Sequence, residues 1–340
     1  MQRQLRRRVQ KRCRFILLCL GLGLLVYIDA ASARGVSPDS TSVRIFSGHQ
    51  GAITAISFSP DGRLLASASL DRSVRLWDIA TRKNLRILRG HTDEVYTVVF
   101  SPDGQYLASS GYDRRVIVWQ PASGKIVQNI SLSSWSTAIG FSADGRLGVA
   151  DHQGNIAILN PKTGLMIRKW KVDLGVFSLA FSPDGRSLVT GGPINVWDVQ
   201  TGEKLKELPA PGGVTAIVFS PDGRFLVTAH WRGSARLWNF ATGELINTLE
   251  PKVTRRVRGP SGYVALDLEM PMAAAAFSPD GKFVLTAGED KAVRIWDVLT
   301  RTEVRQFTGH TMAVTGLAFT SDGKYLASGS LDGSVRLWLF

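Results

Sequence analysis

One short motif recurs along nearly the whole chain and limits its fold more than any other feature. The motif is Ser-Pro-Asp-Gly or a close variant, and its aspartates are Asp61, Asp103, Asp144, Asp184, Asp222, Asp280 and Asp322. Neighbouring copies are 38 to 42 residues apart, except for a gap of 58 between Asp222 and Asp280. Ser, Pro and Gly at these positions are typical of a type I turn. The period predicts seven copies of one structural unit.

Each turn stands between two segments with the composition of β-strands. An apolar stretch that ends in Phe precedes it, as in Ile53–Phe58, and a segment of small residues follows. A tryptophan follows the marker Asp by sixteen residues in five copies, at Trp77, Trp119, Trp238, Trp296 and Trp338. Trp197 comes three residues early, and Leu159 replaces the tryptophan in the third copy. With a fourth apolar segment per copy, the sequence predicts an all-β, seven-bladed β-propeller of four-stranded antiparallel blades.

The motifs resemble those of the WD-repeat β-propeller family over about residues 41–340. The resemblance is carried by Gly48-His49…Trp77-Asp78, Gly90-His91…Trp119 and Gly309-His310…Trp338. In that family a His, a small hydroxyl residue, an Asp and a Trp form a buried hydrogen-bonded network within a blade. The resemblance implies such structural networks for blade one (His49, Ser67, Asp71, Trp77), blade two (His91, Ser109, Asp113, Trp119) and blade seven (His310, Ser328, Asp332, Trp338).

The other four blades depart from the pattern. Blade six has Leu268 at the His position, blade five has Arg232 at the Asp position, and blade four shortens its second turn to Gly191-Gly192-Pro193. These departures indicate either adaptation to a partner or blades that are held by their neighbours. His152 and His230 are single residues in expected turns, and we expect both to be solvated.

The last copy ends at Phe340 after its third strand, which would leave an exposed sheet edge. Thr41–Ser47 precedes the first Gly-His and belongs to no complete blade of its own. We therefore predict that residues 41–47 pair beside Ser334–Leu339, complete blade seven and close the ring. Residues 41–340 would then form one domain, which we expect to be monomeric.

The first residues have a different composition. Met1–Arg14 holds seven basic residues, Phe15–Ile28 holds no charge, and Ala31-Ser32-Ala33 follows. This order is typical of a secretory signal peptide over residues 1–33, with a linker at 34–40. The predicted location is extracytoplasmic, either periplasmic or secreted, and the alternative is an anchor in the membrane through residues 15–28. Removal of residues 1–33 loses seven positive charges and Asp29, so the net charge of +13 becomes 13 − 7 + 1 = +7.

An insertion at residues 250–272 accounts for the one long gap between copies. It carries a basic cluster of Lys252, Arg255, Arg256 and Arg258. A long loop in a compact domain is often functional, although it can also be a flexible excursion. The cluster is therefore a candidate partner site, and contact with an anionic surface would make binding depend on salt.

No catalytic or cofactor motif is present in the sequence. It lacks a phosphate-binding G-x-x-x-x-G-K-[ST] loop, H-E-x-x-H and G-x-S-x-G, and its two cysteines, Cys13 and Cys19, both lie in the leader. We expect no cofactor and no metal. A moderately basic, exported body also argues against a nucleic-acid partner.

The resemblance implies partner contacts at the start of each first strand and just before the Asp of the second turn. The residues at these positions are Glu94, Tyr96, Tyr112, Trp135, Phe177, Trp231 and Glu289. Aromatic anchors often dominate the energy of an interface, although such rings can also pack over a channel mouth. The main hypothesis is a non-enzymatic scaffold that binds protein or peptide on its top face. The alternative is an enzyme or small-ligand binder with a site in the central channel.

Overall fold

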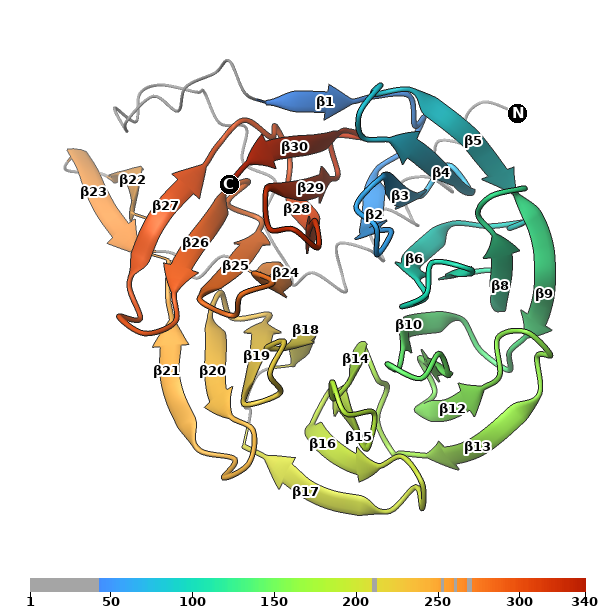
Figure 1. Ribbon diagram of the computed structural model, residues 1–340. Coiled ribbons are helices and arrows are strands. Elements are labelled where there is room, and N and C mark those ends of the chain that lie inside the picture. Colours follow the sequence, from blue (N-terminus) through green and yellow to red (C-terminus); the bar gives the residue numbers. More distant parts are fainter. Residues whose placement is uncertain (1–42, 210–212, 252–253, 260–261, 268–270) are drawn as a thin grey trace. The chain divides into compact units, whose positions relative to one another are not determined.

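The computed structural model describes residues 43–209, 213–251, 254–259, 262–267 and 271–340. These residues belong to one compact unit, Thr41–Phe340, and form seven four-stranded antiparallel sheets in a closed ring (Figure 1). The predicted seven-bladed propeller is therefore confirmed. In the part of the chain that is described, no helix has the length and apolar composition needed to cross a membrane. The predicted leader and linker, residues 1–33 and 34–40, lie outside the described residues.

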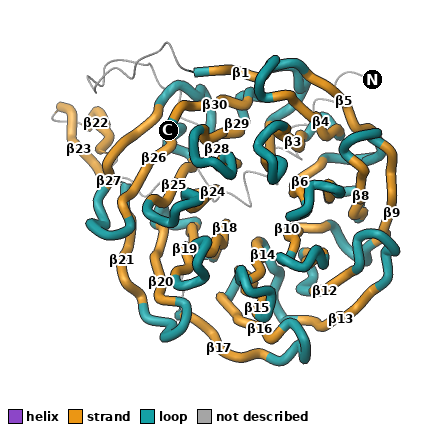
Figure 2. Tube along the Cα trace, in the orientation of Figure 1, coloured by secondary structure: helices purple, strands orange, loops and turns teal. Residues whose placement is uncertain are grey.

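The chain builds each blade from the centre of the ring outwards, and tight turns join its strands (Figure 2). The first, innermost strands are β2 (Ile53–Phe58), β6 (Val95–Phe100), β10 (Ser136–Phe141), β14 (Ser178–Phe181), β18 (Val214–Phe219), β24 (Met272–Phe277) and β28 (Val314–Phe319). The second strands are β3 (Leu64–Ser69), β7 (Leu107–Gly111), β11 (Leu147–Asp151), β15 (Ser187–Gly191), β19 (Phe225–His230), β25 (Phe283–Gly288) and β29 (Tyr325–Ser330). The third strands are β4 (Ser73–Asp78), β8 (Arg115–Gln120), β12 (Asn155–Leu159), β16 (Ile194–Asp198), β20 (Ala235–Asn239), β26 (Val293–Asp297) and β30 (Val335–Leu339). The outermost strands are β5 (Asn84–Arg89), β9 (Lys125–Ser131), β13 (Met166–Lys171), β17 (Lys204–Leu208), β21 (Leu245–Leu249), β27 (Glu303–Phe307) and β1 (Arg44–Phe46).

The hydrophobic core lies between adjacent blades. Between blades one and two, Val74 and Leu88 pack with Val98, Leu107 and Trp119 in one buried cluster. Each face of a blade is covered by a neighbour in this way, so a blade cannot bury its apolar residues alone.

The recurring motif closes the turn between the first and second strands. In blade one the Gly62 amide donates to the Ser59 carbonyl at 2.9 Å, and Gly62 has a φ of 67°, which favours glycine. The Ser59 hydroxyl donates to the Asp61 carboxylate at 2.5 Å and accepts from the Leu64 amide at 2.9 Å. The Ser59 hydrogen bond holds the pKa of Asp61 below its usual value. The marker aspartate of this turn therefore has a structural role, as the acceptor of hydrogen bonds within the turn.

Strand β1 closes the ring, as predicted from the truncated last copy. Its residues pair antiparallel with β30, with Arg44 opposite Leu337 and Phe46 opposite Val335. The Phe46 ring is buried and lies edge-on to Trp77 of blade one, with 5.7 Å between ring centroids. The first and last described strands thus complete one blade, although the observed strand is shorter than residues 41–47.

The insertion contains a two-stranded antiparallel hairpin, β22 (Thr254–Gly259) and β23 (Gly262–Asp267). Arg255 pairs with Leu266, Arg256 with Ala265 and Arg258 with Tyr263. Lys252 lies outside the described residues. A partner role for this basic cluster stays a prediction.

Replacement of Phe46 by Ala should destabilise the whole ring. A buried Phe→Ala change typically costs about 3–5 kcal/mol, because it removes apolar contact and leaves a cavity. Ile45→Ala is the matched control, since Ile45 is 52% exposed on the same strand. Urea unfolding should show a large fall in the midpoint for Phe46→Ala and almost none for Ile45→Ala. Equal shifts for the two variants would contradict the closing role of β1.

Candidate functional site

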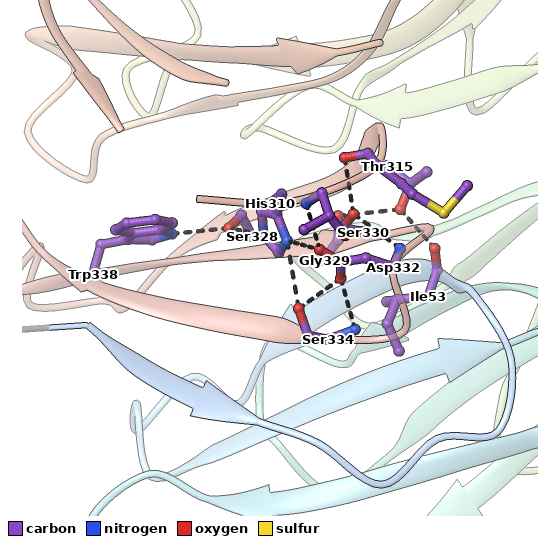
Figure 3. Close-up of polar contacts among 11 residues, drawn as sticks. Ile53, His310, Thr315, Ser328, Gly329, Ser330, Asp332, Ser334 and Trp338 are labelled. Atoms are coloured by element: carbon purple, nitrogen blue, oxygen red, sulfur yellow. Dashed lines mark hydrogen bonds and ion pairs between the residues drawn. The ribbon is translucent and has the colours of Figure 1, made fainter. Parts of the chain in front are cut away.

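Four polar side chains form a continuous network inside blade seven (Figure 3). The Trp338 indole donates to the Ser328 hydroxyl at 2.9 Å, and the His310 Nε2 lies 2.8 Å from the same oxygen. The His310 Nδ1 lies 2.9 Å from Asp332. Because the indole can only donate, the Ser328 hydroxyl donates to Nε2, and the proton of the neutral imidazole sits on Nδ1, facing Asp332. Burial lowers the pKa of His310, which favours this neutral form.

The same network is present in blades one and two. In blade one, Ser67 accepts from Trp77 at 2.8 Å, and His49 bridges Ser67 at 2.8 Å and Asp71 at 2.7 Å. The blade-two distances are 2.8 Å for Trp119 to Ser109, 2.8 Å for Ser109 to His91 and 2.9 Å for His91 to Asp113. Burial raises the pKa of Asp71, but the hydrogen bonds from His49 and Ser73 outweigh it and hold the pKa below the usual range. Every network member has its partners, as a structural role requires.

Blade five forms a related network with a histidine from a different place in the chain, so the expectation that His230 is solvated is wrong. His230 ends strand β19, is only 1% exposed, and places its Nε2 2.8 Å from the Thr228 hydroxyl. Trp238 donates to the same hydroxyl at 2.9 Å. Burial, followed by the charge of Arg236, lowers the pKa of His230 to about 4. The signal was a histidine two residues after a strand threonine, which points to the same side of the sheet.

Blades four and six keep the tryptophan bond without a histidine among the described residues. Trp197 donates to Thr190 at 2.9 Å and Trp296 to Thr286 at 2.8 Å. Asp290 of blade six instead pairs with Arg294 at 2.7 Å. Leu268, expected at the His position of that blade, lies outside the described residues.

The seven predicted partner residues outside the insertion share one face of the ring, which we call the top face. Because strands alternate in direction, this face carries the loops from each outermost strand to the next first strand and the turns between second and third strands. Glu94, Tyr96, Trp135 and Phe177 lie at or beside the starts of first strands, and Tyr112, Trp231 and Glu289 lie in the turns. Burial raises the pKa of Glu289.

Five aromatic side chains of blades two to four form a continuous row, here called the aromatic arc. It comprises Tyr96, Tyr112, Trp135, His152 and Phe177. Successive centroids along that order are 6.0, 5.2, 4.5 and 6.0 Å apart. Trp135 stacks on His152 with an interplanar angle of 18°, and His152 is exposed as expected. The row thus unites four predicted residues with a histidine that sequence reasoning had left unassigned.

The remaining predicted residues stand apart from the arc or support it. Glu94 accepts a hydrogen bond from the Tyr96 hydroxyl at 3.3 Å. Trp231 lies against Gly213, where an added Cβ would come within 2.4 Å of the indole ring. Next to the arc, a hollow of about 550 Å³ is lined by Leu174, Gly175, Phe177, Gly192, Pro193, Glu207, Leu208, Pro209 and Gly213. Phe177 belongs to both the arc and the hollow.

A bulge at the start of the first strand sets the direction of the second side chain, which in blade two is Tyr96 of the arc. In six blades the register shifts after the first residue, and a bulge re-aims the side chain of the second. Threonine fills this second position in blades one, three, five and seven and donates to the next blade's first strand or the residues just before it. The bonds are Thr54 to Val95 O at 2.8 Å, Thr137 to Val176 O, Thr215 to Met272 O at 2.7 Å, and Thr315 to Ile53 O at 2.7 Å (Figure 3). Blade two places Tyr96 there instead. In blade four, Phe177 directly precedes β14, which shows no register shift.

The described residues contain no group of three His, Cys, Asp or Glu side chains that could hold a metal ion. The histidine–carboxylate pairs that are described lie inside blades, with their hydrogen bonds used. Among the described residues of the top face, the aromatic arc is the candidate binding feature.

Comparison with known proteins agrees with this architecture. The model of the family described as "WD domain, G-beta repeat" matches residues 40–78, 82–120, 167–198, 202–239, 267–297 and 301–338. The stretch between residues 120 and 167, which contains Trp135 and His152, falls outside these matches. The aromatic arc is thus centred on the blade that resembles the family least.

Individual repeats are similar to those of several characterised proteins. Protein Mut11 of Chlamydomonas reinhardtii is 48% identical over 62 residues, which cover 16% of this chain and 17% of that protein. WD repeat-containing protein 36 of Homo sapiens is 62% identical over 37 residues, covering 11% and 4%. Transcription initiation factor TFIID subunit 5 of Caenorhabditis elegans is 51% identical over 45 residues, covering 13% and 7%. The matched part of this chain therefore spans less than a fifth of each of these relatives.

The buried His230 should make stability fall as the pH falls from 6.5 to about 4. In the unfolded chain the imidazole takes up a proton near pH 6.5, whereas in the folded chain it stays neutral down to about 4. The unfolded state binds more protons in this window, so the folded state loses about 3 kcal/mol, at about 1.36 kcal/mol per pKa unit. Urea unfolding of wild type and His230→Gln across this range measures the effect. Other titrating groups are common to both proteins, so parallel pH profiles would contradict it.

Proposed function

This chain belongs to the WD domain, G-beta repeat family, and from that premise we propose that it is a non-enzymatic scaffold that binds a protein or peptide through its top face. WD-repeat propellers are typical protein-interaction scaffolds. The observation that carries the proposal is the aromatic arc, five rings in mutual contact on loops and strand starts of a rigid ring. Binding residues are often found on loops that a rigid scaffold holds in place.

The composition of the arc fits a protein interface. Interface cores are enriched in Tyr, Trp and Phe, and these residues are frequent hot spots. The four aromatic members other than His152 are partly exposed, so each presents apolar surface while its neighbours hold its orientation. The relative from Caenorhabditis elegans is by name a subunit of a larger factor, which is in keeping with a scaffold role here.

We also propose that the propeller works outside the cytoplasm. The support is the leader alone: a basic segment, the uncharged Phe15–Ile28 and Ala31-Ser32-Ala33. An exported scaffold would meet extracytoplasmic partners, and a retained leader would hold it at the membrane surface.

Loss of the arc should abolish partner binding without unfolding the propeller. We expect Tyr112→Ala/Trp135→Ala to lower recovery of co-purified proteins at least about tenfold, because a hot-spot aromatic contributes about 2 kcal/mol or more. Leu299→Ala is the matched control, since Leu299 is 88% exposed in a turn on the opposite face. The measurement is affinity purification of the tagged chain with quantitative mass spectrometry, alongside thermal unfolding of each variant. Unchanged recovery from a folded double variant would contradict top-face binding.

The leader should direct the chain out of the cytoplasm. N-terminal sequencing and fractionation of the native cell should recover a chain that begins after Ala33 in an extracytoplasmic fraction. Leu17→Arg/Leu18→Arg interrupts the apolar run and should leave the chain uncleaved in the cytoplasm. An uncleaved wild-type chain in the membrane fraction would support the anchor instead, and an uncleaved chain in the cytoplasmic fraction would refute export.

A further inference from the structure

The hollow beside the arc owes its existence to the shortened turn of blade four. In blade one the network hydroxyl and tryptophan are ten residues apart, Ser67 and Trp77, whereas in blade four Thr190 and Trp197 are seven apart. The strand register is unchanged, because Leu188 pairs with Trp197 as Leu65 pairs with Trp77. The three missing residues therefore come from the turn on the top face. Blade four also has no Gly-His loop to pack there, so the space stays open.

The floor of the hollow is bare main chain. Gly192 has a φ of 144°, and a Cβ added to it would lie 2.8 Å from the Gly175 carbonyl oxygen. The two loops touch through backbone atoms, and a side chain at Gly192 would force them apart. Such glycine contacts allow a ligand to approach the backbone closely.

The walls of the hollow are apolar. Leu174 is 61% exposed at its rim, and Phe177, Pro193, Leu208 and Pro209 line it. Glu207 is the charged residue in the described lining, and its carboxylate pairs with Lys204 at 3.0 Å. A volume of about 550 Å³ is within the range of ligand pockets, about 300–1,000 Å³. The hollow is therefore suited to bulky apolar side chains.

The hollow continues the aromatic arc, which favours an extended ligand. Phe177 ends the arc and lines the hollow, and on the far side Trp231 lies on Gly213 of the lining. The apolar strip thus runs over blades two to five. Along the arc alone, ring spacings of 4.5 to 6.0 Å would accompany roughly six residues of an extended chain at about 3.3 Å each. A small apolar molecule would fill the hollow without contacting the rest of the aromatic arc.

Exposed cations bracket this apolar strip. Arg114 follows Tyr112 by two residues, Arg232 follows Trp231, and both are exposed in top-face turns. Neither forms a salt bridge with another described residue. Arg114 also holds a φ of 61°, where the equivalent turn of blade three has Gly154. Arg72 of blade one and Lys291 of blade six hold the same turn position with φ of 69° and 67°, so this backbone recurs in the ring, and Arg114 is distinguished by its place beside the aromatic arc.

Two acidic residues beside Tyr96, Asp93 and Glu94, form hydrogen bonds within their own loop. Glu94 accepts from the Tyr96 hydroxyl, and the Asp93 carboxylate accepts from the Glu94 amide at 3.1 Å. At the hollow itself, Glu207 pairs with Lys204, and the exposed Asp173 precedes Leu174. Arg114 and Arg232 are exposed cations beside Tyr112 and Trp231, toward the two ends of the strip.

We propose that the top face binds an extended peptide segment with an apolar centre and acidic residues on both sides. The apolar centre fills the hollow and lies along the aromatic arc, and the acidic flanks pair with Arg114 and Arg232. The inference rests on the proposed function, since it specifies the partner of the same face.

The test uses a phage-displayed library of random linear peptides, selected on the purified chain. Enriched peptides should combine bulky apolar residues with acidic flanks, and a synthetic representative should bind in fluorescence polarisation. Lysine in place of its acidic residues should weaken binding about tenfold or more, and raised salt should weaken it too. Leu174→Ala should also weaken it about tenfold, whereas Leu299→Ala should have no effect.

Arg114→Gly separates binding from folding. Glycine relieves the left-handed backbone at this turn, so the unfolding midpoint should stay equal or rise, while affinity for the selected peptide falls about tenfold. A role in stability alone would move the midpoint and leave the affinity unchanged.

Three results would overturn the inference: basic or purely polar consensus peptides, no enriched peptides, or equal affinity for wild type, Leu174→Ala and Arg114→Gly. If protein partners are still lost from Tyr112→Ala/Trp135→Ala, the scaffold function stands and only the peptide class is wrong.

Discussion

A single hydrogen bond sets the internal order of most blades: the indole of the third strand donates to a Ser or Thr hydroxyl of the second. It recurs in six blades, with Ser67, Ser109, Thr190, Thr228, Thr286 and Ser328 as acceptors. The bond fixes the register of two strands and buries the largest side chain of the blade without leaving its N–H unpaired. A buried hydroxyl that lost this partner would cost about 1–3 kcal/mol. The blades differ in the second group that contacts this hydroxyl.

That second group determines whether the entering loop and the turn between the second and third strands are joined on the top face. In blades one, two and seven a histidine from the preceding loop reaches the hydroxyl and ties the loop to the turn through an aspartate. In blade five the histidine comes from the second strand itself, so the loop and the turn are not joined in this way. Blade four has neither histidine nor full turn, and the hollow appears there. The hollow thus lies at the blade whose turn is shortened.

The sequence predicted the fold well because a propeller is specified within each repeat. The turn motif, the strand before it and the tryptophan after it all recur at fixed spacing, and even the closing strand followed from an incomplete last copy. The site was predicted only as a set of positions. That Tyr112, Trp135 and His152 touch depends on the angle between blades two and three, which no single repeat encodes. His230 was misjudged for the opposite reason: its partner Thr228 is only two residues away, but the repeat pattern placed the network histidine in a loop. The hollow could not be predicted from the sequence, because neighbouring loops can also move in and fill the space above a shortened turn.

The innermost strands show how closure and recognition share the same ring. Threonine at the second position joins blades one to two, three to four, five to six and seven to one. In a ring of seven, an alternating pattern must place two such blades side by side, and here they are seven and one. The bond from Thr315 to Ile53 therefore joins the innermost strands of blades seven and one. These are the blades at which the two ends of the propeller meet, and β1 pairs with β30 at the outer side of blade seven. Tyr96 takes this position in blade two, and Phe177 directly precedes β14 in blade four. Continuous chain joins both blades to the next, so the ring can close there without the threonine bond. Aromatic side chains can then occupy the top face of these blades without loss of the bond from Thr315 to Ile53, which joins the first and last blades.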